Sequence, residues 1–197
     1  GLLSVSGSRI SENTAEFEFA HGGGAWLFAE NGGELQINDT EFDSNSADGD
    51  KSEGGAIWLR NDKESSTSFS GLTVSNNEAA NGGGVWANTV GQSSTSVVWT
   101  QLSNNTASSR GGGIWGRTSG ESEFAISAST VEGNSAEFGG GVNLDSDSGS
   151  ISLHTTSLVS NVAAVRGGGV NLLGRGQTSY EIRSSTASDN SAGETGG

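Results

Sequence analysis

Apolar residues two positions apart recur in a block that occurs seven times along the chain. In the second block, Leu35 and Ile37 alternate with the polar Gln36 and Asn38, which is the pattern of a strand with one buried face. Each block therefore predicts an inward-facing strand whose intervening side chains face solvent. The paired inward positions are Leu3/Val5, Leu35/Ile37, Thr67/Phe69, Thr95/Val97, Phe124/Ile126, Ile151/Leu153 and Tyr180/Ile182.

An Asn-x-Ala pair follows each block and sets the period of the repeat. Successive pairs are 32, 32, 28, 29, 27 and 29 residues apart, which is the spacing of a solenoid. Three positions before each Asn, a further apolar residue such as Phe42 predicts a second short inward-facing strand. Because one carboxamide recurs per turn, the Asn side chains are predicted to stack and hydrogen-bond from coil to coil as a structural ladder. The ladder residues are Asn13, Asn45, Asn77, Asn105, Asn134, Asn161 and Asn190.

A glycine triad, or Gly-Gly-Ala in the second repeat, begins five to nine positions after the Asn in six repeats. Repeated glycine here fits a turn with positive φ and a close approach of the backbone. Two apolar positions follow each triad, as at Ile57 and Leu59, and predict a third inward-facing strand. The residue between them must face outward, and it is tryptophan in four repeats before it changes to asparagine. This outward column is Trp26, Trp58, Trp86, Trp115, Asn143 and Asn171.

Three short strands per repeat predict an all-β fold, a single-stranded right-handed parallel β-helix, or β-solenoid. The handedness is expected because parallel crossovers are overwhelmingly right-handed. The repeat length is 27–32 residues, so the chain forms about six to seven coils. We expect residues 1–197 to form a single β-helical segment that is a fragment of a longer repeat protein.

The second repeat, with Phe42-Asp-Ser-Asn45 and Gly54-Gly55-Ala56-Ile57, resembles the paired FxxN and GGA[ILV] repeats of the chlamydial polymorphic membrane proteins and related autotransporter-type bacterial surface proteins. The resemblance spans nearly the whole chain, although other apolar residues replace Phe in most repeats. It implies a right-handed β-helical passenger that is exposed at the bacterial cell surface and is associated with adhesion. The tryptophan column is not part of the family motif.

Composition narrows the expected location and partners. The chain has 33 Gly and no Pro, so every residue in a strand keeps the backbone N–H that pairs with the next strand. It also has no Cys, so no disulfide or thiolate metal site can form. The formal net charge of −14 repels phosphate backbones and anionic membrane surfaces, which disfavours nucleic acid as a partner. No apolar run approaches the roughly 18 residues of a membrane span, so we do not expect membrane insertion by this segment.

Two classes of function fit this pattern. The first is a non-enzymatic extracellular surface or fibre protein, an adhesin-like passenger or a filament segment that acts through its repetitive outer faces and open coil ends. Its expected partners are other copies or neighbouring repeats of the same chain, a glycan, or a host or cell-surface protein. The alternative is a polysaccharide-binding or polysaccharide-degrading β-helix, a lyase or hydrolase.

Degradation of a polysaccharide requires an acid and a base that converge on one bond. Asp145, Arg60 and Arg117 lie on separate coils in the predicted solenoid. His21 and His154 lie about five coils apart, roughly 24 Å at the spacing of strands in a sheet, so they cannot act together. The sequence therefore assigns no catalytic residue, and we expect no enzymatic activity.

The candidate binding or assembly surface consists of Trp26, Trp58, Trp86 and Trp115. A row of exposed indoles can stack on sugar rings or contact a protein partner. The alternative is that the indoles pack on one another and under a neighbouring loop or subunit, because an apolar column of this size is seldom left bare. Two aspartate pairs are candidates for calcium, but each pair lacks the further oxygen ligands of a recognisable loop, so no metal or other cofactor is assigned. These pairs are Asp48/Asp50 and Asp145/Asp147.

Overall fold

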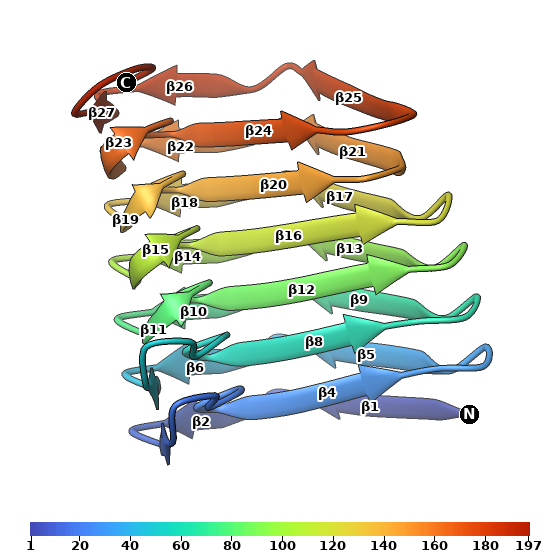
Figure 1. The fold of residues 1–197 in the computed structure, drawn as a ribbon. Coiled ribbons are helices and arrows are strands. Elements are labelled where there is room, and N and C mark those ends of the chain that lie inside the picture. Colours follow the sequence, from blue (N-terminus) through green and yellow to red (C-terminus); the bar gives the residue numbers. More distant parts are fainter.

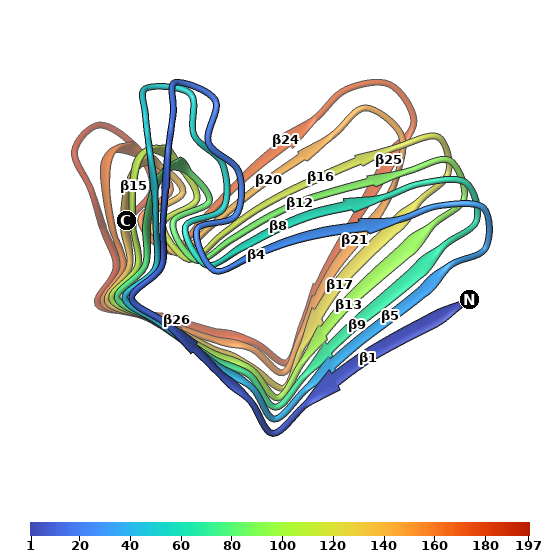
Figure 2. The same cartoon turned by 90° about the horizontal axis from the view of Figure 1, so that it is seen from below.

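The computed structural model describes residues 1–197 as a parallel β-solenoid without any helix. The chain winds through seven coils from the N-terminus at one end to the C-terminus at the other (Figure 1). Seen from the N-terminal end, the chain runs clockwise as it moves away from the viewer, so the solenoid is right-handed (Figure 2). The predicted right-handed parallel β-helix is therefore confirmed.

The strands form four parallel sheets with one strand per coil in each. Sheet A contains β1 (Leu2–Ser6), β5 (Glu34–Asn38), β9 (Ser66–Ser70), β13 (Ser94–Val98), β17 (Glu123–Ser127), β21 (Gly149–His154) and β25 (Thr178–Arg183). Sheet B contains β2 (Arg9–Ser11), β6 (Glu41–Asp43), β10 (Thr73–Ser75), β14 (Gln101–Ser103), β18 (Thr130–Glu132), β22 (Ser157–Val159) and β26 (Thr186–Ser188). Sheet C contains β3 (Thr14–Glu16), β7 (Ser46–Asp48), β11 (Glu78–Asn81), β15 (Thr106–Arg110), β19 (Ser135–Phe138), β23 (Val162–Arg166) and β27 (Ser191–Ala192). Sheet D contains β4 (Ala25–Ala29), β8 (Ile57–Asn61), β12 (Val85–Val90), β16 (Ile114–Ser119), β20 (Val142–Ser146) and β24 (Val170–Gly174).

The main core lies between sheets A, B and D, where the predicted inward columns meet. Equivalent positions stand in register from coil to coil, as in the stack of Phe42, Val74 and Leu102 in sheet B. A single cluster of 23 buried residues includes Phe69 and Phe124, so the solenoid has one continuous core. This continuity follows from the period of the apolar columns, because each core residue packs on its equivalents in the neighbouring coils.

Sheet C is the difference from the three strands per coil that the sequence predicts. Its strands begin directly after the ladder Asn, in the segment whose length varies between repeats. The inward side chains here are small, and Ala20, Ala47 and Ala79 form a cluster separate from the main core. Alternation between alanine and polar residues is hard to distinguish from the sequence of a loop. The sequence pattern therefore predicts three strands per coil, whereas the structure has four. In the first two coils the segment after sheet C is longer and projects beyond the later coils (Figure 2).

The Asn ladder closes the corner between sheets B and C. Asn134 Oδ1 accepts hydrogen bonds from the backbone N–H and from Nδ2 of Asn105, both at 2.9 Å. Asn105 Nδ2 also donates to the carbonyl oxygen of Val74, one coil earlier, at 2.9 Å. The same side-chain bond, 2.9–3.0 Å long, links all six successive pairs. The five inner Asn residues are at most 1% exposed, so these bonds satisfy groups that water cannot reach.

Each position of the glycine triad meets a different physical requirement. The first glycine has a positive φ of 61–70° in all six triads, a conformation that is costly for residues with a side chain. The second lies against the backbone of the next coil, because a Cβ on Gly112 would lie 2.4 Å from the carbonyl oxygen of Gly140. The third position tolerates a methyl group, since Ala56 occupies it in the second repeat.

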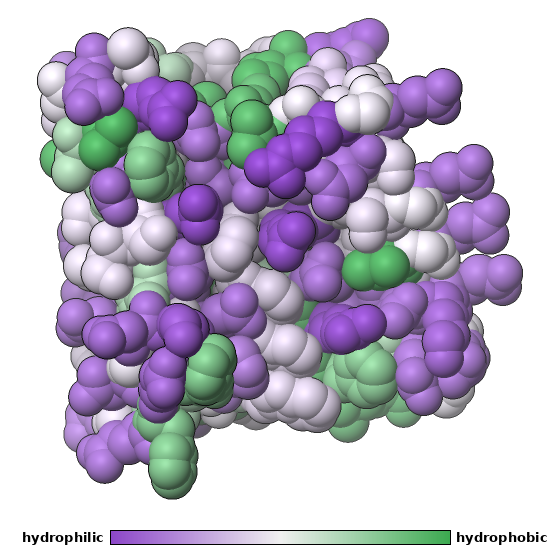
Figure 3. Space-filling view, viewed as in Figure 1, coloured by the Kyte–Doolittle hydropathy of each residue, from purple (hydrophilic) through white to green (hydrophobic).

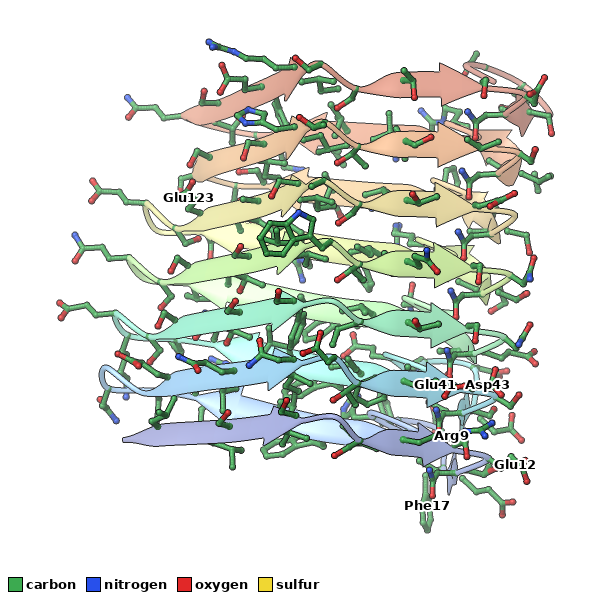
Figure 4. The ribbon with its side chains drawn as sticks, turned by 180° about the vertical axis from the view of Figure 1, so that it is seen from behind. Arg9, Glu12, Phe17, Glu41, Asp43 and Glu123 are labelled. Carbon is green, nitrogen blue, oxygen red and sulfur yellow. The ribbon has the colours of Figure 1, made fainter.

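The outer face of sheet B carries ion pairs. Arg9 lies beside Glu41 and Asp43, with nitrogen-to-oxygen distances of 3.6 and 3.5 Å (Figure 4). Hydrogen bonds donated by Asn76 and Ser75 hold the pKa of Asp43 below its ordinary value, and Arg9 adds a smaller effect of the same sign. Because these groups are partly solvated, each ion pair contributes little to stability.

We expect Asn105→Ala to lower the free energy of unfolding by about 1–3 kcal/mol more than Asn13→Ala. Asn105 is buried and bonds to the coils on both sides, whereas Asn13 is exposed and, apart from its bond to Ser11 in the same coil, bonds only to the second coil. Denaturant unfolding followed by circular dichroism measures both variants. Equal and small losses would show that these side chains act as simple turn residues.

Gly112→Ala and Gly113→Ala form a matched pair of variants one residue apart. At position 112 the new Cβ would lie 2.4 and 2.5 Å from two carbonyl oxygens, so the coils must separate. At position 113 the closest atom would be 2.7 Å away, and Ala56 already shows that this column accepts a methyl group. We expect the Tm of Gly112→Ala to fall at least about 4 °C further than that of Gly113→Ala. A similar Tm for both variants would contradict the close-approach explanation.

Candidate binding cleft

Two columns of side chains face each other between the end of sheet C and the outer face of sheet D. Members of the sheet D column stand in register on adjacent strands. The facing column consists of the residue immediately before each glycine triad, and we call the space between the two columns the cleft. Figure 3 shows this side of the molecule as a mainly hydrophilic surface with separate apolar patches. The facing pairs are His21/Trp26, Glu53/Trp58, Asn81/Trp86, Arg110/Trp115, Phe138/Asn143 and Arg166/Asn171.

The four tryptophans fill the cleft over the first four coils. The rings of Trp26, Trp58 and Trp86 stack nearly parallel with centroids 5.1 Å apart, and Trp115 meets Trp86 edge-on at 6.0 Å. Trp58, Trp86 and Trp115 are 5–8% exposed and form a cluster separate from the main core, whereas Trp26 is 56% exposed. The column points away from the main core, yet three of its four indoles are covered within the chain. A binding or assembly role for this column stays a prediction, and Trp26 is the member that solvent reaches most.

Polar side chains of the facing column, together with Arg117 on β16, contact two of the indoles. Trp58 Nε1 donates a hydrogen bond to Glu53 Oε2 at 2.9 Å. The guanidinium groups of Arg110 and Arg117 lie over the Trp115 ring, 5.6 and 5.9 Å from its centroid. Such cation–π contacts hold the guanidinium group against the indole and leave the N–H groups of the guanidinium directed elsewhere. The cleft is therefore closed at these coils by paired aromatic and charged side chains.

Beyond Trp115 the sheet D column changes to Asn143 and Asn171, and a hollow of about 200 Å³ opens. Asn143 is only 1% exposed, and its side chain is held at both ends. Its Nδ2 donates to Asp145 Oδ1 at 3.2 Å, and its Oδ1 accepts from Asn171 Nδ2 at 2.7 Å. The floor of the hollow is thus a fixed row of amide and carboxylate groups. Its walls include Arg110, Phe138, Arg166 and Leu173.

The basic residues around this part of the cleft have no acidic partner. Six of the nine Lys and Arg residues lie within 4 Å of a carboxylate oxygen, which leaves three without an ion pair. These three are Arg110, Arg117 and Arg166, and all contact aromatic rings at the cleft instead. Arg110 and Arg166 lie over the Phe138 ring, 5.9 and 5.4 Å from its centroid. The cleft therefore gathers the unpaired positive charge of a strongly acidic chain.

The residues considered for polysaccharide chemistry are brought together only in part. Asp145 and Arg117 occupy equivalent positions on the adjacent strands β20 and β16. Arg60 lies two coils before Arg117 and pairs with Asp62 at 3.1 Å. Burial is the main reason that the pKa of Tyr180 is above its ordinary value, and the negative charge of Asp145 raises it further. Asp145 is the one acidic residue that lines the hollow, so a pair of converging carboxylates is not formed there.

His154 lies in sheet A, whereas His21 lies outside the named strands, directly before the first glycine triad. His154 on β21 pairs with Glu181 at 3.1 Å, while the His21 ring lies 5.3 Å from that of Trp58 in the cleft. Three or more His, Cys, Asp or Glu side chains do not come together anywhere to hold a metal ion. Calcium also accepts backbone and hydroxyl oxygens, so the two aspartate pairs stay candidates for calcium although no metal is assigned to them.

Residues 100–117 match the family model of the Chlamydia polymorphic membrane protein repeat. The matched segment contains β14, the ladder residue Asn105, the glycine triad at 111–113 and the start of β16. The repeat at residues 100–117 is thus similar to the repeats of the polymorphic membrane proteins. This match and the β-solenoid confirm the predicted resemblance, and this repeat type is that of surface-associated membrane proteins.

The other comparisons and the helix content add two findings. No curated protein and no solved structure matches the chain. The structure contains no helix of the length and hydrophobicity needed to cross a membrane. The match at residues 100–117 is therefore the finding that links this chain to known proteins.

Sequence reasoning missed the facing column of the cleft. Its members share no chemistry, and they lie at the end of the segment whose length varies between repeats. The signal that could have found them is position, because each stands directly before a glycine triad and five residues before the outward residue of sheet D. Arg110, Phe138 and Arg166 then emerge as one column with a cation on each side of an aromatic ring.

We expect Trp86→Ala to lower the free energy of unfolding by about 3–5 kcal/mol, as for other buried aromatic residues. Trp26→Ala removes the same atoms from a half-exposed site, so we expect less than half of that loss. Denaturant unfolding measures the two values, with far-ultraviolet circular dichroism to show that each variant retains its β structure. Losses of the same size would mean that the cleft does not bury Trp86 more than Trp26.

Proposed function

We propose that this chain is a non-enzymatic segment of an extracellular or bacterial cell-surface protein, an adhesin-like β-helical passenger. The match of residues 100–117 to the polymorphic membrane protein repeat carries this proposal. The continuous stack of seven coils supports it, because in-register sheets form a rod of roughly 30 Å that holds side chains at fixed positions. The same architecture suits a filament segment whose repeats stack end to end through open strand edges.

Glycan binding is the second candidate function, and the polar hollow beside Asn143 favours it. Its amide, carboxylate and guanidinium groups are the kinds of side chain that hydrogen-bond sugar hydroxyls and acidic substituents. Binding of a glycan is compatible with a surface location, since an adhesin requires a recognition site on its outer face. The two candidates therefore describe the location of the protein and the chemistry of one of its sites.

Antibodies raised against residues 1–197 are expected to label intact, unpermeabilised producing cells. A protease added to the same cells should remove this labelling while it leaves a cytoplasmic marker protein uncut. Fluorescence counting of intact and permeabilised cells provides the measurement. Labelling that appears only after permeabilisation would contradict the proposed surface location.

A further inference from the structure

The hollow exists because the repeat changes its chemistry at one point. Indoles occupy the sheet D column in four coils, and the shorter amides of Asn143 and Asn171 follow them. The facing column does not shrink to match, since Phe138 and Arg166 stand opposite these two amides. About 200 Å³ is therefore left open, which is a volume suited to a small ring and not to a large ligand. The rest of the cleft is filled by the protein itself.

The positive charge at the hollow is free to meet a ligand. Arg110 and Arg166 have no carboxylate partner, although the chain has a net charge of −14 and its other Lys and Arg residues outside the cleft are all ion-paired. Contact with the Phe138 ring holds both guanidinium groups against the wall. A planar guanidinium presents paired N–H donors that match the two oxygens of a carboxylate.

The floor of the hollow selects against a bare anion. Asp145 places a negative charge there, which repels a multivalent ion such as phosphate. Its Oδ2 and the Oδ1 of Asn171 accept no hydrogen bond within the chain, so both can accept one from a hydroxyl group. The exposed side chain of Leu173 adds an apolar contact for ring C–H groups. A matching ligand thus carries one carboxylate, several hydroxyls and a partly apolar ring.

We propose that the hollow binds a single acidic sugar residue, a pyranose that carries a carboxylate, such as a uronic acid unit of a glycan. The carboxylate pairs with Arg166, which lies opposite Asn171, and the ring hydroxyls donate to Asp145 and Asn171. The C–H face of the ring packs on Leu173. This inference rests on the glycan-binding candidate and names the chemistry of its ligand.

Calorimetric titration of the 197-residue chain with galacturonate, and with galactose as the matched neutral sugar, tests the proposal. We expect saturable binding of galacturonate and at least about tenfold weaker binding of galactose, because a charge-assisted hydrogen bond is lost. Arg166→Gln should weaken galacturonate binding by a similar factor. Arg9→Gln is the control, since Arg9 is an exposed arginine on sheet B, away from the cleft.

Asn143→Trp is a second variant that continues the indole column by one coil and fills the hollow. We expect it to abolish galacturonate binding and to retain the circular dichroism of the parent chain. Should this variant not fold, Arg166→Gln still decides the question, because its side chain is exposed and its loss leaves the core unchanged.

Three results would overturn the proposal. They are the absence of saturable galacturonate binding, equal binding of galactose or inorganic phosphate, and an equal loss of binding in Arg9→Gln and Arg166→Gln. Chromatography of galacturonate trimers after incubation with the protein is a further test. We expect to recover intact trimers, and cleavage of the trimers would show that the hollow is a catalytic site instead of a binding site. Labelling of intact cells does not depend on the hollow, so failure of this proposal and failure of the proposed surface location are distinguishable.

Discussion

Hydrogen bonding between successive coils is the constraint on which the whole structure depends. Within the sheets, strands satisfy their backbone N–H and C=O groups by pairing in register. At the corners the backbone turns, so these groups need other partners. The Asn side chain supplies them at the corner between sheets B and C, where Asn134 Oδ1 accepts two bonds from Asn105. At the triad, the absence of a side chain lets Gly112 approach the carbonyl oxygen of Gly140. The residues that define the repeat are therefore corner residues, while the strand positions between them need only be apolar or polar in alternation.

This division explains how much of the fold could be predicted from the sequence. Sheets A, B and D were predicted because large inward residues such as Phe69 and Val74 alternate with polar ones and recur at a fixed distance from the Asn. Sheet C was not, because Ala47 and Ala79 provide little contrast with a loop. The direction of the tryptophan column also followed from alternation. The burial of the tryptophan side chains could not be predicted, because Glu53 and Arg110 reach the cleft only through the path of a segment whose length varies between repeats.

A break in the repeat is where a solenoid acquires chemistry that its other coils lack. Perfect repetition would give every coil the same outer surface and the same weak contacts. Between Trp115 and Asn143 the sheet D column loses its indole, while Phe138 and Arg166 remain opposite. One polar hollow results on a rod that is otherwise closed along this cleft. The positive charge that gathers there stands out because the rest of the chain is acidic, and salt screens the distant charges far more than the close ones.

The direction of the hydrogen bonds between coils determines how the rod responds to tension. Strands lie across the long axis, so the bonds that join neighbouring coils run nearly along it. A pull on the two chain ends peels an end coil away bond by bond, because a terminal strand pairs with the rest of the rod on one side only. Coils therefore detach singly from an end, each releasing a loop of 27–32 residues. A tethered rod of this kind lengthens in steps under mechanical force, and the coils not yet detached keep their shape.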